Sequence, residues 1–355
     1  MASDCASVTF ACAVEWLMAI GSHIIPRFYL EQFANANRRK GRSGNVWVYE
    51  KGKPPRQAST KAQGYENGYF AFVRSDGRRD ESFETQLAKL ENRCDDVLVC
   101  AKSKLFDLRV LIHRTTLAFY MGLLFARSTS RRKFSAGNWA KLKGPFSQLE
   151  FNEEYVQDTA AHYTEYTGEV VTPEQVRQLI RKQAQRFSEK EMIGNTFIQD
   201  LLFHAEVMKT ELVPRAWQVW QAPTGTEFVT SDNPVVTFVR LKEDLWHPGH
   251  GFRQPGVVVA FPLAPTACLT VGFADRPEFQ EVDAATVTLL NDIVVRCSDR
   301  FVYSKTLSEE IKKMVNEVGR TSVPGETAFV GAFPDAQRIE EHLRRTMGIR
   351  RRKAN

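Results

Sequence analysis

The stretch Glu227-Phe-Val-Thr-Ser-Asp-Asn-Pro-Val-Val-Thr-Phe-Val239 holds two runs of β-branched and aromatic residues, separated by Ser231-Asp232-Asn233-Pro234. Such runs are typical of strands, and Pro234 disfavours helical geometry at the residue before it. The segment therefore predicts a strand, a polar corner and a second strand. Ser, Asp and Asn side chains also bond neighbouring backbone in ordinary turns. The corner is thus either a turn or a site that holds a carboxylate, an amide and a hydroxyl at a sheet end.

Strand patterns dominate the chain after Pro214, and helical patterns dominate before it. The predicted strands are 217–221, 228–230, 235–239, 257–262 and 267–272, with outlying strands at 45–50 and 300–303. Frequent turn signals favour an antiparallel sheet over alternating βαβ units. We therefore predict an α+β fold, in which a mainly helical body at 23–213 joins a small antiparallel sheet in the C-terminal half. This sheet lobe at 215–303 receives both outlying strands. The apolar run 117–125 is expected to be the buried central helix.

The length and composition indicate one globular domain with an extension at each end. The chain has 355 residues, of which 43% are hydrophobic and 25% are charged, as in soluble globular proteins. Residues 1–17 are apolar, interrupted by Glu15 and too short to span a bilayer, so we expect a dispensable extension. The single α+β domain is expected at 18–305. C-terminal helices and a basic tail follow at 306–355.

The charge and cysteine patterns bear on partners and on location. The net charge of +6 is partly concentrated in basic runs at 38–40, 131–133 and 350–353. Such runs are solvated faces or contacts for nucleic acid or another anionic partner. The 6 cysteines form no CxxC pair, so we expect neither a disulfide framework nor a structural zinc site. A reducing, cytoplasmic location without membrane contact follows, and the oligomeric state stays open.

Three residues in the first half have positions that suit a functional site. His23 precedes a helix predicted to begin near Pro26, so it is a ligand, a general base or a cap. Glu84 and Glu91 are seven residues apart, so they share a helix face and either hold a divalent metal or form a solvated edge. Arg127 ends the apolar helix and either pairs with a buried carboxylate or meets an anionic ligand.

An ordered set of segments resembles a known family. The set is His23-x-x-Pro26-x-x-x-Leu30-x-x-Phe33, Val46-Trp-Val-Tyr-Glu-Lys51, Glu81-x-x-Glu84, Arg127 and Phe228-Val-Thr-Ser-Asp-Asn-Pro234. Over roughly residues 22 to 305 it resembles the microbial domain of unknown function 4238 (DUF4238). The resemblance implies a soluble, mixed α and β protein and does not supply a reaction. Its motif-bearing segments contain the candidate site residues His23, Glu84, Arg127, Asp232 and Asn233.

Two functions of different class are compatible with these residues. The first is a metal-dependent hydrolase that acts on a phosphodiester or another anionic substrate. In it, Asp232 and Glu84 hold a divalent metal such as magnesium or manganese, His23 is the general base and Arg127 steadies negative charge. Asn233 completes this candidate catalytic set. The alternative is a non-catalytic binding module for nucleic acid or another anionic partner, in which the same polar residues form a buried structural network.

Overall fold

The computed structural model describes most of the chain, and the chain divides into two compact units. The described residues are 21–35, 43–73, 79–80, 82–102, 107–133, 151–186, 190–242, 245–249, 251–272, 278–319, 341 and 344. The larger unit comprises Met1–Arg132 and Ile198–Gly325, and the smaller one Lys133–Phe197 and Glu326–Asn355. Residues 1–17 and the run 350–353 lie outside the described residues. The dispensability of residues 1–17 therefore stays a prediction. The single domain at 18–305 also stays a prediction.

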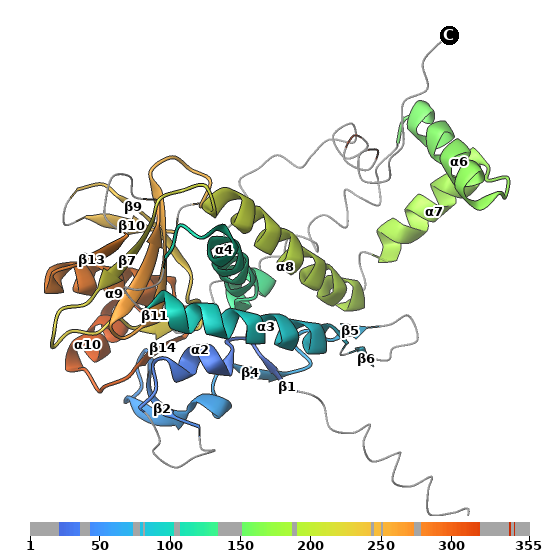
Figure 1. Ribbon diagram of the computed structural model, residues 1–355. Coiled ribbons are helices and arrows are strands. Elements are labelled where there is room, and N and C mark those ends of the chain that lie inside the picture. The colour runs from blue at the N-terminus through green and yellow to red at the C-terminus, as the bar shows by residue number, and fades with distance from the viewer. Residues whose placement is uncertain are drawn as a thin grey trace, which may run out of the picture. The chain divides into compact units, whose positions relative to one another are not determined.

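The largest sheet among the described residues has six strands in the order β10-β9-β11-β12-β7-β13 (Figure 1). Its strands are β7 (Trp217–Gln221), β9 (Val236–Arg240), β10 (Trp246–Pro248), β11 (Val257–Ala264), β12 (Ala267–Val271) and β13 (Phe279–Glu281). Neighbours are antiparallel except β13, which pairs parallel with β7. Every residue of β11 and β12 is buried. Near-continuous apolar strands of this kind are expected where both faces of a sheet are covered.

A second sheet brings together segments that are far apart in the sequence. Its four strands, in the order β3-β2-β14-β8, are β3 (Arg56–Ser59), β2 (Asn45–Glu50), β14 (Phe301–Ser304) and β8 (Thr230–Ser231). Two strand pairs complete the β-structure of the described residues, β1 (Gly21–His23) with β4 (Tyr65–Asn67) and β5 (Phe72–Val73) with β6 (Arg79–Asp80). The 3-10 helix η2 (Thr60–Ala62) precedes β4.

The prediction of a mainly helical body with a small antiparallel sheet is wrong, because the fold is mixed α+β with a larger sheet. The main sheet has six strands and includes a parallel pair. The strands predicted at 45–50 and 300–303 are β2 and β14, and they pair with each other in the separate four-stranded sheet. Sequence pattern shows which face of a strand is buried, whereas the partner strand is chosen by long-range packing that no local pattern contains.

Helices cover both faces of the main sheet. Alternate residues of β11 point to opposite faces, with Val259 and Phe261 in one apolar core and Val258 and Ala260 in the other. The first core includes residues of α2 (Arg27–Glu31), α3 (Ser82–Ala101), α4 (Leu111–Ala126) and α8 (Lys190–Leu212). The second includes residues of α9 (Ala284–Cys297) and α10 (Glu309–Val318). The prediction of a buried helix around 117–125 is confirmed by α4.

The smaller unit is built on α6 (Glu153–Thr167) and α7 (Pro173–Arg186). A cluster that includes Tyr155 and Val176 joins the two helices. Arg344 returns to α6 and donates to Asp158 at 2.5 Å, with both side chains buried. Arg344 is thereby attached to α6 by a charge pair.

Gly122 permits close contact between α4 and α8. A Cβ atom added at this position would lie 2.6 Å from Cα and 3.0 Å from the carbonyl oxygen of Ala205, so the two backbones would have to separate. We expect Gly122→Ala to lower the free energy of unfolding by about 1 to 2 kcal/mol, since overpacking outweighs the better helix propensity of alanine. Urea unfolding measures the change. Gly251→Ala is the control, because an added Cβ there meets nothing within 4 Å; equal effects would contradict the packing argument.

Candidate functional site

The guanidinium of Arg127 is the most unusual polar group in the described part of the larger unit. Its side chain is 1% exposed, and its Nη1 donates to Oε1 of Glu91 on α3 at 2.5 Å. Nε and Nη2 are buried and have no hydrogen-bond partner among the described residues. The Phe70 ring lies 5.9 Å from Cζ. The sequence left open whether Arg127 pairs with a buried carboxylate or binds an anionic ligand. Glu91 is such a carboxylate, and it binds one of the three nitrogens.

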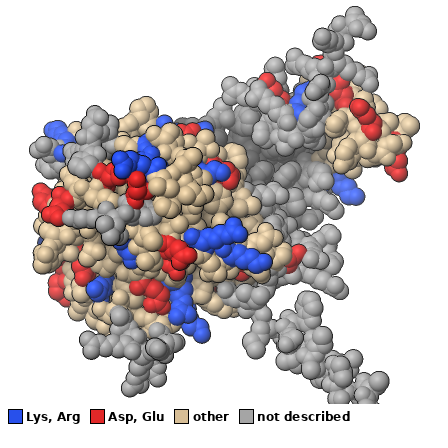
Figure 2. Space-filling view, viewed as in Figure 1, with Lys and Arg blue, Asp and Glu red and all other residues tan. Residues whose placement is uncertain are grey.

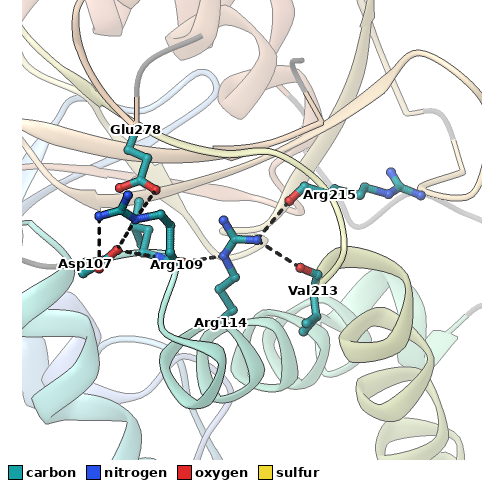
Figure 3. Close-up of polar contacts among 7 residues, drawn as sticks. Asp107, Arg109, Arg114, Val213, Arg215 and Glu278 are labelled. Atoms are coloured by element: carbon teal, nitrogen blue, oxygen red, sulfur yellow. Dashed lines mark hydrogen bonds and ion pairs between the residues drawn. The ribbon is translucent and has the colours of Figure 1, made fainter. Parts of the chain in front are cut away.

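Arg114, at the other end of α4, has a guanidinium whose bonds stabilise the fold. Arg114 donates from Nη1 to the carbonyl oxygens of Val213 (3.3 Å) and Arg215 (3.4 Å), and from Nε to that of Leu108 (Figure 3). The bonds to Val213 and Arg215 satisfy carbonyls just beyond the end of α8, where backbone acceptors have no donor within the helix. The nearby Arg109 lies between Asp107 and Glu278. Arg114 and Arg109 are thus bound by backbone carbonyls and carboxylates. Two of the three nitrogens of Arg127, by contrast, have no hydrogen-bond partner among the described residues.

His23 ends β1, and the charges of Glu91 and Arg127 act on its ring. Its Nε2 lies 3.4 Å from the carbonyl oxygen of Lys61. Because a carbonyl only accepts, Nε2 is the donor, which leaves Nδ1 as an acceptor on the neutral ring. Burial lowers the pKa of His23; Glu91 raises it and Arg127 lowers it further. The neutral imidazole is therefore favoured, and the ion pair lies within electrostatic reach of the ring.

Tyr120 belongs to this cluster and was missed by the sequence interpretation. It is 0% exposed, and its hydroxyl has no hydrogen-bond partner in the described part of the chain. Burial raises its pKa well above the ordinary value, while the charges of Arg127 and Glu91 also act on it. Tyr120 precedes Arg127 by seven residues, about two turns, so the two share a face of the helix. The spacing to Arg127 was the available sequence signal for Tyr120. Because Tyr120 stands within the apolar run 117–125, the residue resembles an ordinary packing residue.

Cys94 lies near the cluster without the properties of a nucleophile. It is 0% exposed on α3. Burial raises the pKa of its thiol to about 12, with Glu91 adding to the effect. The thiolate is the reactive form of cysteine, so this residue is inert at neutral pH.

The carboxylate of Asp232 holds the backbone turn that leads into β14. Oδ1 accepts from the N–H of Asp299 at 2.7 Å, and Oδ2 accepts from those of Arg300 (2.8 Å) and Phe301 (2.9 Å). Burial and the neighbouring Asp299 raise the pKa of Asp232 above its ordinary value, and the three N–H groups act in the opposite direction. Both oxygens therefore have partners in the fold itself.

Asn233 and Ser231 complete a turn at this corner. Asn233 donates from Nδ2 to the carbonyl oxygen of Cys297 at 2.9 Å, and its backbone N–H donates to Oγ of Ser231 at 3.2 Å. Asp299 in turn accepts through Oδ2 from the N–H of Ser130 at 2.8 Å. The corner is thereby linked to the segment that follows Arg127. These contacts explain a structural role, and the catalytic roles of Asp232 and Asn233 stay predictions.

Glu84 occupies the first turn of α3, and Glu91 follows almost two turns later. Glu91 is the member of this pair that binds Arg127. Within the described ranges, no group of three or more His, Cys, Asp or Glu side chains is placed to hold a metal ion. The metal role of Glu84 and Asp232 stays a prediction.

The fold and this cluster define a class: a mixed α+β protein in which a buried, partly unsatisfied arginine lies near a neutral histidine. Residues 22–308 match the family "Protein of unknown function (DUF4238)", and the chain belongs to this family, which confirms the resemblance. Comparisons with curated proteins and with solved structures found no match. Among the described helices, none has the length and apolar character needed to span a membrane.

Proposed function

We propose that the chain is a hydrolase acting on an anionic substrate, a phosphodiester or another phosphate ester. The observation that supports it best is the buried guanidinium of Arg127, which keeps two donors available after Glu91 has taken one. A buried donor without a partner is costly, so an anion that binds there gains from satisfying it. Glu91 fixes the orientation of the guanidinium and is a positioning residue.

His23 supplies the second part of the chemistry. In this proposal its Nδ1 accepts a proton from a water molecule while that oxygen forms a bond to phosphorus. The bond from phosphorus to the ester oxygen breaks, and the imidazolium returns the proton to the leaving alcohol. Arg127 stabilises the negative charge that builds up on the phosphoryl oxygens. A lowered pKa keeps His23 in the basic form this step requires.

A divalent metal at Asp232 and Glu84 remains part of the earlier hypothesis but is not needed here. The oxygens of Asp232 accept three backbone N–H bonds, which already account for its burial at the corner. The proposed bond changes involve His23 and Arg127, and Glu91 orients the guanidinium. A cytoplasmic location is also part of the proposal and rests on the cysteine pattern.

The alternative is a non-catalytic module that binds nucleic acid or another anionic partner. Figure 2 shows one face of the molecule, on which Lys and Arg alternate with Asp and Glu instead of forming a single basic surface. Several exposed arginines are also paired, such as Arg253 with Glu211 and Arg300 with Glu50. A polymeric anion needs a continuous basic surface. On the face shown in Figure 2, the described charges therefore favour the enzyme.

The test is hydrolysis of p-nitrophenyl phosphate and bis(p-nitrophenyl) phosphate by the full chain. We expect turnover of at least one probe, and we expect His23→Asn to lower kcat about 100-fold, within the range for loss of a general base. KM should change little, because Arg127 still binds the anion. His247→Asn, at the exposed middle residue of β10, is the control. Binding of these probes without turnover by the wild type would support the non-catalytic alternative.

A further inference from the structure

We infer that Arg127 and Tyr120 form an enclosed site for a tetrahedral oxyanion, the terminal phosphate of a monoester or free phosphate. The inference rests on the proposed function, because it assigns the substrate class of the same site. Its observations are the two unpartnered nitrogens of Arg127 and the unpartnered hydroxyl of Tyr120, all buried. The spacing of seven residues puts Tyr120 and Arg127 on one helix face, and the charge of Arg127 acts on the Tyr120 hydroxyl, so these three donors lie in one part of the core.

The two available nitrogens of Arg127 are the pair that binds oxyanions best. In a guanidinium, the N–H of Nε and one N–H of Nη2 are parallel along one edge, so they reach two oxygens of the same group. Glu91 occupies Nη1, which lies away from that edge. The ion pair thus orients the guanidinium and leaves its two-pronged edge intact. A carboxylate bound across the edge would have removed this capacity.

Tyr120 distinguishes a tetrahedral anion from a planar one. A carboxylate has two oxygens, and the edge of Arg127 uses both. A phosphate has further oxygens out of that plane, and the hydroxyl of Tyr120 can donate to one of them. The charge of Arg127 acts on this hydroxyl, and both residues lie on the same face of α4. The third donor therefore favours phosphate over carboxylate.

Burial separates a phosphate monoester from a diester. Arg127 and Tyr120 are almost fully enclosed, whereas the Glu91 side chain is 16% exposed and His23 is only partly buried. The cluster thus meets solvent at His23, the partly buried group that the proposed mechanism places beside the anion. A monoester has one substituent, which can leave on that side. A diester has two, and the second would have to pass through the packed core.

Isothermal titration calorimetry on the full chain tests the inference at constant ionic strength. The probes are inorganic phosphate, phenyl phosphate, diphenyl phosphate and acetate. We expect saturable binding of the first two at one site, and binding of the other two at least tenfold weaker. Tyr120→Phe should weaken phosphate binding about tenfold, as expected for one hydrogen bond to a charged group. Tyr303→Phe is a matched control, since that hydroxyl is also buried without a partner in the described structure.

Several outcomes would overturn the inference. They are absence of phosphate binding, equal binding of acetate or diphenyl phosphate, and equal effects of Tyr120→Phe and Tyr303→Phe. A failure of the proposed function looks different. Phosphate would then bind with the expected dependence on Tyr120, but neither p-nitrophenyl ester would be hydrolysed.

Discussion

Arg127→Met is expected to lower the free energy of unfolding by about 3 kcal/mol and to abolish phosphate binding. Loss of the guanidinium leaves the partly buried Glu91 carboxylate without its partner at 2.5 Å, and an uncompensated charge of this kind is strongly destabilising. Methionine retains much of the apolar volume, so packing contributes less to the loss. Urea unfolding at pH 7 measures the stability, and calorimetry measures the binding.

A second substitution separates stability from ligand binding. Glu91→Leu added to Arg127→Met should recover most of the lost stability, because an apolar pair replaces a buried ion pair without an unpaired charge. Phosphate binding should stay absent, since the donors are gone. Arg296→Met is the control for an exposed pair, and breaking its contact with Asp292 should cost less than about 1 kcal/mol. Normal stability of Arg127→Met would show that the ion pair does not hold the cluster.

Asp232→Ala is expected to lower the free energy of unfolding by about 2 kcal/mol. The substitution removes the acceptor of the backbone N–H groups of Asp299, Arg300 and Phe301, which precede or begin β14. Partly buried N–H groups without a partner carry a desolvation cost, whereas relief of the repulsion from Asp299 offsets part of the loss. Thermal or urea unfolding measures the difference.

Asp283→Ala provides the control for this prediction. Asp283 is an exposed carboxylate that caps α9 through one bond to the N–H of Thr286 at 2.8 Å, so its loss should cost less stability than the loss of Asp232. If Asp232→Ala were as stable as the wild type but inactive, the corner would be catalytic, as the sequence interpretation held. A stability loss larger than that of Asp283→Ala supports the structural role.

Local pattern predicted those parts of the fold that depend on neighbouring residues. The strand expected at 217–221 coincides with β7, and the buried helix around 117–125 lies within α4. β-branched and aromatic alternation and an unbroken apolar run are strong local signals. The pairing of β14 with β2 connects residues about 250 positions apart, and no pattern within either strand specifies it. For this reason the extent of the sheets was mispredicted.

The candidate site was predictable only one residue at a time. The end of an apolar helix singled out Arg127, and its position before a helix singled out His23. Which carboxylate on α3 would meet Arg127 depended on how α3 packs against α4, and the structure selects Glu91. Tyr120 could not be separated from its apolar neighbours, because a tyrosine within a core helix is ordinarily a packing residue.

The most direct measurement is the 15N–1H NMR signal of the Arg127 Nε group during a titration with inorganic phosphate. The Arg127 signal is assigned as the one that is absent from the spectrum of Arg127→Lys. We predict a saturable shift of this signal in the wild type and a titration midpoint that Tyr120→Phe moves about tenfold higher. If other signals of the protein respond to phosphate and reach saturation while the Arg127 Nε signal does not move, an oxyanion site at Arg127 is contradicted.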